Sequence, residues 1–172
     1  MEQVFSIPRA SKGAYLICGI LVAGLAAGAV LFLRAPEGEM VASVIGTGVF
    51  GVFALFFAWL LAQLHRCRLI LEPTALRFEV PWYSRRIALD QIDRAGVRLI
   101  DDAIAAEWKL TWRINGIGLP GFLVGWFSST GRKRVLAART QGVEVLIPTT
   151  KGFTLLVSLE DPKAFLDALH GL

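Results

Sequence analysis

The sequence has little of what most catalytic and metal sites require. It contains only two histidines, His65 and His170, and only two cysteines, Cys18 and Cys67. Neither a Cys-x-x-Cys pair nor a zinc-protease motif occurs, and a Ser-His-Asp triad would have to use one of these two histidines. Cys18 falls inside a long apolar run and Cys67 outside it, so we expect two reduced thiols rather than a disulfide. We therefore expect no enzyme, no cofactor and no metal.

Charge is scarce as well, and the scarcity is confined to the first part of the chain. Charged residues make up 19% of the sequence, against about a quarter in a typical globular domain. Only six of them lie in the first 64 residues, whereas residues 65–172 have a normal share. Residues 14–33 and 41–64 have none, and as helices these runs are long enough to cross a hydrocarbon core of about 30 Å. The sequence predicts two uncleaved transmembrane helices.

The segment between the two runs predicts how they are arranged. Residues 34–40 contain Pro36 and Gly38, which favour a tight turn and an antiparallel helical hairpin. Basic residues flank the outer ends of the hairpin: Arg9 and Lys12 in the tail of residues 1–13, and Arg66, Arg68, Arg77, Arg85 and Arg86 after the second run. The loop has only Arg34. This bias predicts that both termini are cytoplasmic.

Small residues recur at four-residue spacing in both apolar runs. They are Gly24 and Gly28 in the first run and Ser43, Thr47 and Gly51 in the second. Such residues let helix backbones approach closely in lipid, and packing within one hairpin explains them as well as dimerisation does. Neither run contains an ionisable Asp, Glu, Lys, Arg or His, which counts against a transporter or an ion pathway. The two runs are best interpreted as an anchor.

From residue 66 onward, apolar residues recur at every second position, as in strands with one face in a core. The alternating sets are Leu76, Phe78 and Val80; Leu110, Trp112 and Ile114; Val143, Val145 and Ile147; and Phe153, Leu155 and Val157. Turn signals, among them Asn115-Gly116 and Thr130-Gly131, separate these sets. The pattern favours a small antiparallel barrel or sandwich.

Only the end of the chain has a helical period. Asp161 and Pro162 predict an N-cap followed by a first-turn proline. The residues expected on the apolar face of this helix are Phe165, Leu166, Leu169 and Leu172.

The residues of this soluble part resemble a known family. Gly116, Gly118, Pro120, Gly121, Gly125 and Trp126, followed by Asp161, Pro162 and Phe165, are similar to the signature of a bacterial PH-like (pleckstrin-homology-like) domain family. The resemblance covers roughly residues 66–170, and members often carry two membrane spans ahead of the domain. It implies a mainly-β PH-like barrel or sandwich closed by one C-terminal α-helix, over residues 65–172. It carries over no enzymatic activity and no ligand residues.

Two local patterns imitate functional motifs. The spacing Gly116-x-Gly118-x-x-Gly121 matches a dinucleotide fingerprint, but Pro120 and a β-like segment follow, and no acidic residue lies at the position expected for ribose binding. We interpret it as a turn. Asp101 and Asp102 are adjacent, which on a strand would place them on opposite faces, and such pairs are typical of turns and caps.

The soluble part also lacks acidic residues over one long stretch. From Trp108 to Val143 there are six basic residues and no acidic one. Three of them, Arg132, Lys133 and Arg134, follow a turn signal, so we expect them at a hairpin tip. Contact with anionic lipid headgroups would contribute about 1 kcal/mol per basic residue near the surface. The alternative is a solvated hairpin balanced by acidic residues such as Glu107 and Glu144.

Together these observations predict a two-span protein of the bacterial inner membrane that displays a cytoplasmic PH-like domain. Its function would be that of a non-catalytic interaction module, and its partner would be another protein or anionic lipid. The alternative is an accessory or regulatory subunit of a membrane complex, with the helical hairpin as its interface. Nucleic acid is not expected as a partner, because the tethered domain lacks a convincing basic footprint.

Overall fold

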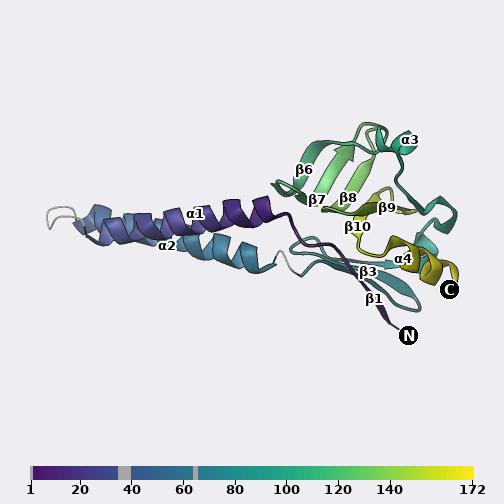
Figure 1. Cartoon of the computed structure of the whole chain (residues 1–172), viewed down its shortest axis with the longest axis horizontal. Coiled ribbons are helices and arrows are strands. Elements are labelled where there is room, and N and C mark those ends of the chain that lie inside the picture. The colour runs from purple at the N-terminus through teal and green to yellow at the C-terminus, as the bar shows by residue number, and fades with distance from the viewer. Residues whose placement is uncertain (1, 35–39, 64–65) are drawn as a thin grey trace. The chain divides into compact units, whose positions relative to one another are not determined.

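The computed structural model describes residues 2–34, 40–63 and 66–172, without the side chains of residues 40, 102 and 103. The chain divides into two compact units: residues 12–65 form one, and residues 1–11 together with 66–172 form the other. Figure 1 shows the first unit as a pair of long helices and the second as a strand-rich domain. Most of the expected loop over residues 34–40, and His65, lie outside the described residues.

The helical unit consists of α1 (Lys12–Leu33) and α2 (Met40–Gln63). Both helices are long and apolar enough to cross a membrane, with mean hydropathies of 2.7 and 2.2 over their most apolar windows. Large apolar side chains are exposed along both of them, such as Leu31 at 70% and Leu55 at 73%. Exposed apolar surface of this extent is unfavourable in water, which supports association with a membrane.

Some of the small residues of the helices lie at the contact between α1 and α2. The Phe50 ring packs where a Cβ on Gly28 would lie only 2.7 Å from it. The Ser43 hydroxyl donates to the Phe32 carbonyl, and the Thr47 hydroxyl donates to the Ala29 carbonyl over 3.4 Å. Packing of small residues and hydroxyl hydrogen bonds hold helices together where no hydrophobic driving force acts.

The strand-rich unit contains two open sheets; a closed barrel is not found in its described residues. The first sheet has the order β1 (Gln3–Ser6), β2 (Arg68–Leu71), β3 (Ala75–Glu79) and β4 (Arg85–Ala88), all antiparallel. In the second sheet the order is β5 (Arg98–Leu99), β9 (Val143–Pro148), β10 (Thr154–Leu159), β8 (Arg134–Arg139), β7 (Phe122–Ser129) and β6 (Leu110–Leu119). Among the described strands of this sheet, β8 and β10 are parallel neighbours and all other pairs are antiparallel. A short helix, α3 (Asp102–Ala105), lies in the connection from β5 to β6.

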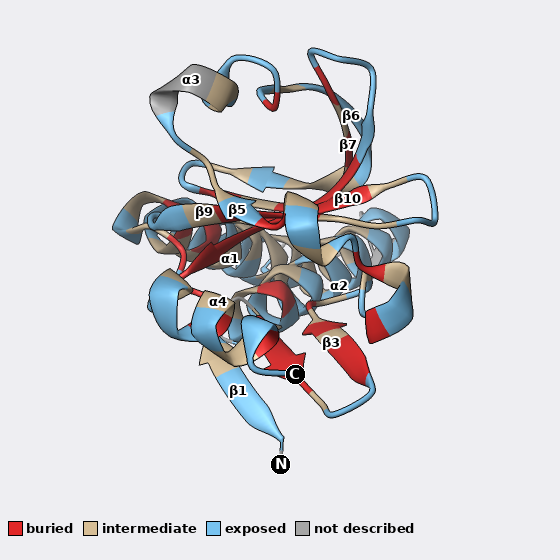
Figure 2. Cartoon of the chain, turned by 90° about the vertical axis from the view of Figure 1, so that its right-hand side faces the viewer, coloured by how far each residue is buried: buried red, intermediate tan, exposed pale blue. Residues whose placement is uncertain are grey.

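The core of this unit follows the alternation in most strands. Leu76, Phe78 and Val80 are buried, and so are Val145 and Ile147. All six residues of β10 are buried, because this strand lies in the middle of the larger sheet. Figure 2 shows the buried residues gathered on inner strands such as β3 and β10, while β1 at the edge is largely exposed.

The C-terminal helix α4 (Pro162–His170) begins as the sequence predicts. Asp161 is its N-cap, since its carboxylate accepts a hydrogen bond from the Ala164 N–H at 3.0 Å, and Pro162 occupies the first turn. Phe165 and Leu169 are fully buried. Leu172 lies beyond the end of the helix and is 54% exposed, so its expected place on the apolar face is wrong.

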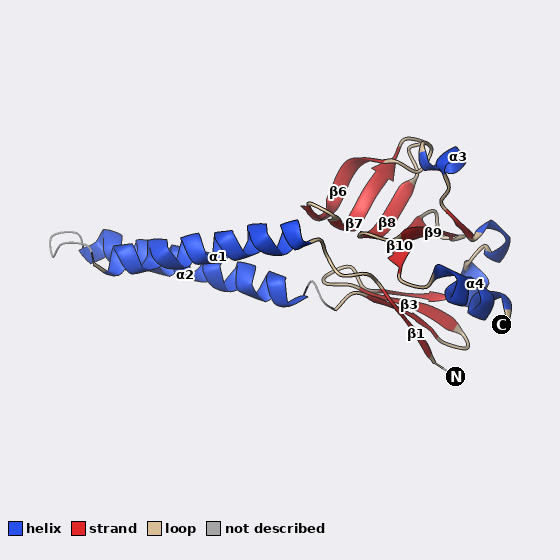
Figure 3. Cartoon of the chain, in the orientation of Figure 1, coloured by secondary structure: helices blue, strands red, loops and turns tan. Residues whose placement is uncertain are grey.

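The N-terminal segment is not a simple tail. Strand β1 pairs with β2 in the register Gln3 to Leu71, and the Phe5 ring meets the Phe165 ring edge-on at 5.2 Å. The Ser6 carbonyl accepts a hydrogen bond from the Glu160 N–H at 3.1 Å. Figure 3 shows β1 alongside the other strands of its sheet. The first eleven residues therefore belong to the strand-rich unit.

This packing predicts the effect of two aromatic substitutions. Phe165→Ala removes a fully buried ring and should destabilise the strand-rich unit by about 3–5 kcal/mol. Phe5→Ala should also lower its melting temperature, by less, because Phe5 is only half-buried. The measurement is thermal unfolding of the full chain in mild detergent, followed by circular dichroism in the strand region.

Val4→Ala is the matched control on the same strand, since Val4 is 55% exposed. It should change the unfolding free energy by no more than about 0.5 kcal/mol. If Phe5→Ala melts at the same temperature as Val4→Ala, β1 does not contribute to the fold.

Candidate interaction surface

The β6–β7 hairpin positions most of the family-like glycines. Gly116 and Gly125 face each other across the two strands, and Gly125 has a φ of 124°. A Cβ on Gly125 would lie 2.5 Å from the Asn115 carbonyl oxygen and from the Gly116 Cα. Only glycine avoids both the strained dihedral and this backbone contact.

The turn of this hairpin comes after the end of β6 and not within it. Pro120 and Gly121 form the turn, with Gly121 at a φ of 67°, whereas Asn115, Gly116 and Gly118 lie within β6. The expected turn at Asn115-Gly116 is therefore wrong. Because these glycines belong to a hairpin and not to a strand-to-helix turn, the apparent dinucleotide fingerprint is not one.

The outer strand of the hairpin departs from the predicted alternation. The register of β6 shifts between Leu110 and Trp112 and again between Arg113 and Asn115. Such irregularities bend a strand and change which side chains face the core. Trp112 is 73% exposed and Ile114 50% exposed, so their expected burial is wrong. Gly116 and Gly118, just after the second irregularity, are a signal in the sequence that could have indicated it, since glycines inside a strand often accompany bulges.

The hairpin tip expected at Arg132, Lys133 and Arg134 is present. Two of these three side chains contact other residues of the domain. The Lys133 ammonium lies 2.6 Å from a Glu107 carboxylate oxygen and 4.5 Å from the centre of the Trp108 ring. This hydrogen bond lowers the pKa of Glu107. Arg134 lies at the start of β8, with its guanidinium 4.9 Å from the Trp126 ring centre.

Trp126 also has an aromatic neighbour, Phe153. Its ring meets the Phe153 ring edge-on at 5.3 Å. The guanidinium of Arg134 therefore lies over one ring of an aromatic pair.

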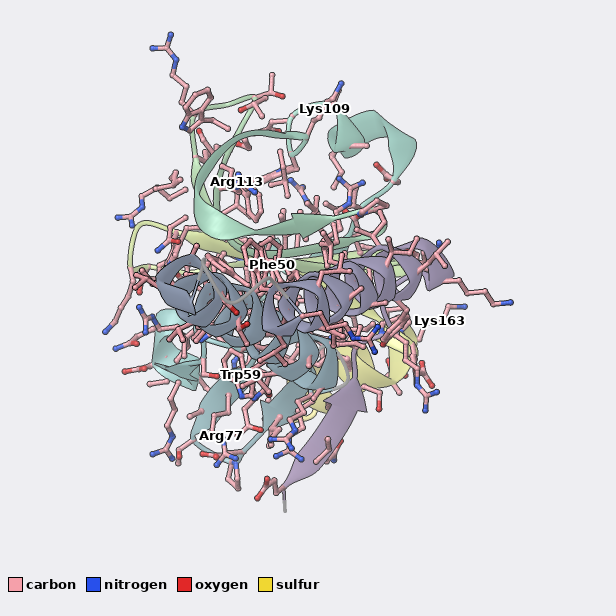
Figure 4. The ribbon with its side chains drawn as sticks, turned by 90° about the vertical axis from the view of Figure 1, so that its left-hand side faces the viewer. Phe50, Trp59, Arg77, Lys109, Arg113 and Lys163 are labelled. Atoms are coloured by element: carbon pink, nitrogen blue, oxygen red, sulfur yellow. The ribbon has the colours of Figure 1, made fainter. Side chains whose placement is uncertain are left out.

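The other basic residues of the acid-free stretch also include one with an acidic partner and others without one. Arg139 forms an ion pair with Glu144. Within the described part of the chain, Lys109, Arg113 and Arg132 form no ion pair. Figure 4 shows Lys109 and Arg113 on the same part of the domain, away from Arg77 on β3. Glu107 and Glu144 therefore balance part of the basic stretch, and contact of its remaining cations with anionic lipid headgroups stays a prediction.

The three unpaired cations are neighbours of the exposed apolar residues. Lys109 immediately precedes β6, and its carbonyl accepts a hydrogen bond from the Thr130 N–H at 3.0 Å, which joins it to the turn that holds Arg132. We refer to Lys109, Trp112, Arg113, Ile114 and Arg132 as the β6 edge surface. It combines positive charge with an exposed indole at the outermost strand of the larger sheet.

A cavity of about 500 Å³ lies between the β5–β6 connection and the ends of β8 and β9. Its wall includes Asp101, Trp108, Arg139 and Glu144. The two carboxylates are occupied: Asp101 accepts a hydrogen bond from the Ile104 N–H at 3.1 Å, as a cap does, and Glu144 pairs with Arg139. The arrangement offers no pair of acid and base groups for catalysis.

Cys67 and metal binding are the remaining candidates for chemistry that the described residues allow to be assessed. Burial raises the pKa of the Cys67 thiol to about 12, so this thiol stays protonated and is a poor nucleophile at neutral pH. Among the described residues, no group of three or more His, Cys, Asp or Glu could hold a metal ion.

The role of Gly125 yields a stability prediction. Gly125→Ala should destabilise the strand-rich unit by about 2–4 kcal/mol, because the added methyl group meets backbone atoms that cannot move independently. Gly131→Ala, at the exposed β7–β8 turn, is the control, since its nearest neighbour would be 3.8 Å away. Denaturant unfolding of the two variants measures the difference, and equal stability would contradict the close approach of β6 and β7.

The comparisons with known proteins agree with this geometry. A family model described as a bacterial PH domain matches residues 67–172. No curated protein and no solved structure matches the chain.

Proposed function

The chain belongs to the bacterial PH domain family, and from this premise we propose that it is a non-catalytic, membrane-anchored interaction module. Its domain would be presented to a protein partner or to anionic lipid headgroups. PH domains are generally non-catalytic and often bind lipids or proteins. The observation that carries the proposal is the β6 edge surface, which combines an exposed tryptophan with three cations that form no ion pair in the described part of the chain.

The anchor in this proposal is the pair α1 and α2, and its orientation follows from two arguments. The pairing of β1 with β2 requires that the segments before α1 and after α2 lie on the same side of a bilayer. The basic residues Arg9 and Lys12, and those from Arg66 onward, favour the cytoplasmic side for both. The proposed location is the inner membrane of a bacterial cell.

The hairpin-tip residues take unequal parts in this proposal. Lys133 and Arg134 are engaged by Glu107 and Trp126, whereas Arg132 makes no ion pair in the described part of the chain. Arg132 is therefore the member of the tip that is available to an anionic partner.

The orientation can be tested with reporters in living bacteria. After Leu172, a reporter that works in the cytoplasm should be active and one that works outside should be inactive. In the loop at residues 34–39 we expect the opposite result. Because the charge bias and the β1–β2 pairing agree, we expect this pattern for both fusions. Activity of an externally functioning reporter after Leu172 would overturn the orientation.

The interaction function is tested by purifying the full chain from membranes in mild detergent and identifying bound proteins and lipids. Lys109→Ala/Arg132→Ala should deplete a protein or an anionic lipid that the wild-type chain retains. Lys151→Ala/Lys163→Ala, which removes two exposed charges outside the acid-free stretch, should not. Equal recovery with both variants, or no selective recovery with the wild-type chain, contradicts the proposal.

The alternative, an accessory subunit that uses the helices as an interface, rests on Gly24 and Gly51. No atom lies within 4 Å of a Cβ placed on either glycine, so a further helix could approach there. A partner that is lost with Gly24→Leu but retained by both charge variants would favour this function.

A further inference from the structure

Strand β6 is the outermost strand of the larger sheet and has only one neighbour. It pairs with β7 and is the last strand in the sheet order, so one side of its backbone has no strand partner among the described residues. At ten residues it is the longest strand of the unit. An unpaired edge of this length presents N–H and C=O groups that can accept another strand.

The end of β6 that is regular is also the end with the smallest side chains. From Asn115 to Leu119 the register with β7 is continuous, and Gly118 is exposed and has no side chain, with Arg113 Nη1 3.7 Å from the place where a Cβ would lie. The two irregularities lie before this stretch. An incoming backbone can therefore form a regular ladder along residues 115–119, and its continuation reaches Arg113 and Trp112 across the irregularity between Arg113 and Asn115.

The other end of β6 provides side chains that can recognise a sequence. Cross-strand partners share a face of a sheet, so Trp112, opposite Ser128, lies on one face, and Arg113, opposite the buried Phe127, lies on the other. An added strand would place alternate residues against each of these two faces. Apolar residues would meet Trp112, and acidic residues would meet Arg113, with Lys109 and Arg132 near the same end.

Building on the proposed function, we propose that the partner is a protein, and that an extended segment of it with alternating acidic and apolar residues adds to the free edge of β6 as a seventh strand. Charge complementarity selects this occupant. Among the described residues, three cations of the acid-free stretch in this region have no acidic partner. The free edge offers main-chain hydrogen bonds to a strand, and the two sheet faces beside it differ, which suits a strand of alternating residues.

A second copy of the same chain fits this edge less well. Two β6 strands that paired antiparallel around their charged end would place Arg113 of one copy opposite Arg113 of the other. Like charges placed across neighbouring strands are destabilising. The charge that attracts an acidic segment therefore opposes self-association at this edge.

The test uses the full-length chain in neutral-lipid nanodiscs and a fluorescently labelled, capped peptide of nine residues in which Glu and Val alternate. The anisotropy of the label reports binding as salt concentration is varied. Three further probes are matched to the first: the Lys/Val peptide of the same pattern, the Glu/Val peptide with N-methylated alternate amides, and vesicles containing anionic lipid.

We expect the Glu/Val peptide to bind, more weakly as salt rises, and to slow hydrogen exchange of amides within β6. Its Lys/Val and N-methylated counterparts should not bind, since one lacks the charge and the other lacks the donors. Trp112→Ala should weaken binding about tenfold or more, as for a central aromatic contact. Arg113→Ala/Arg132→Ala should weaken it mainly at low salt.

Two control variants separate these effects from a general loss of structure. Trp82→Ala removes another exposed indole, and Lys151→Ala/Lys163→Ala removes the same number of charges elsewhere. Both should bind the peptide as the wild-type chain does.

The inference is overturned if the Glu/Val peptide fails to bind up to about 1 mM, or if its N-methylated form binds equally well. It is also overturned if Trp112 mediates binding to anionic vesicles without peptide binding, or if the chain dimerises through β6. Should the co-purification experiment identify a partner that depends on Lys109 and Arg132 while no peptide binds, the strand addition fails and the interaction function remains.

Discussion

The pairing of β1 with β2 is the interaction on which the rest of the structure depends. β1 ends at Ser6 and β2 begins at Arg68, so the two helices are inserted between neighbouring strands of one sheet. Closing so long a loop has an entropic cost that grows slowly with its length, and packing of α1 against α2 reduces it by bringing the ends of the helical unit together. The helical unit and the strand-rich unit are therefore coupled through the chain at both ends of the helices.

Most elements of the fold could be predicted from simple patterns, and the exceptions have identifiable causes. The absence of charge predicted α1 and α2, and alternation predicted the buried sets on β3 and β9. β1 was missed because four residues are too few for a periodic signal and Pro8 follows closely. Trp112 and Ile114 were assigned to the core because alternation assumes a regular strand, and the bulges of β6 are set by its pairing with β7.

The candidate site was harder to predict from the sequence than the fold, because it is defined by tertiary contacts. The excess of basic residues was visible in the sequence, and so were Glu107 and Glu144 as the residues that could balance it. Which cations are balanced was not visible, because Lys133 meets Glu107 only through the folding of the β7–β8 turn onto the segment before β6. The cations without an ion pair among the described residues are therefore Lys109, Arg113 and Arg132 rather than the whole hairpin tip. They lie near Trp112, an exposed residue that the alternation predicts to be in the core.

Residues before and after the two helices form one folded domain. Nuclear Overhauser contacts between the ring protons of Phe5 and Phe165, measured on the full chain in nanodiscs, test it most directly. The rings are 5.2 Å apart between centres, so strong contacts are predicted, with the Phe5 signals dispersed as in a folded environment. Sharp Phe5 signals at random-coil positions, with no contact to Phe165, would contradict the claim.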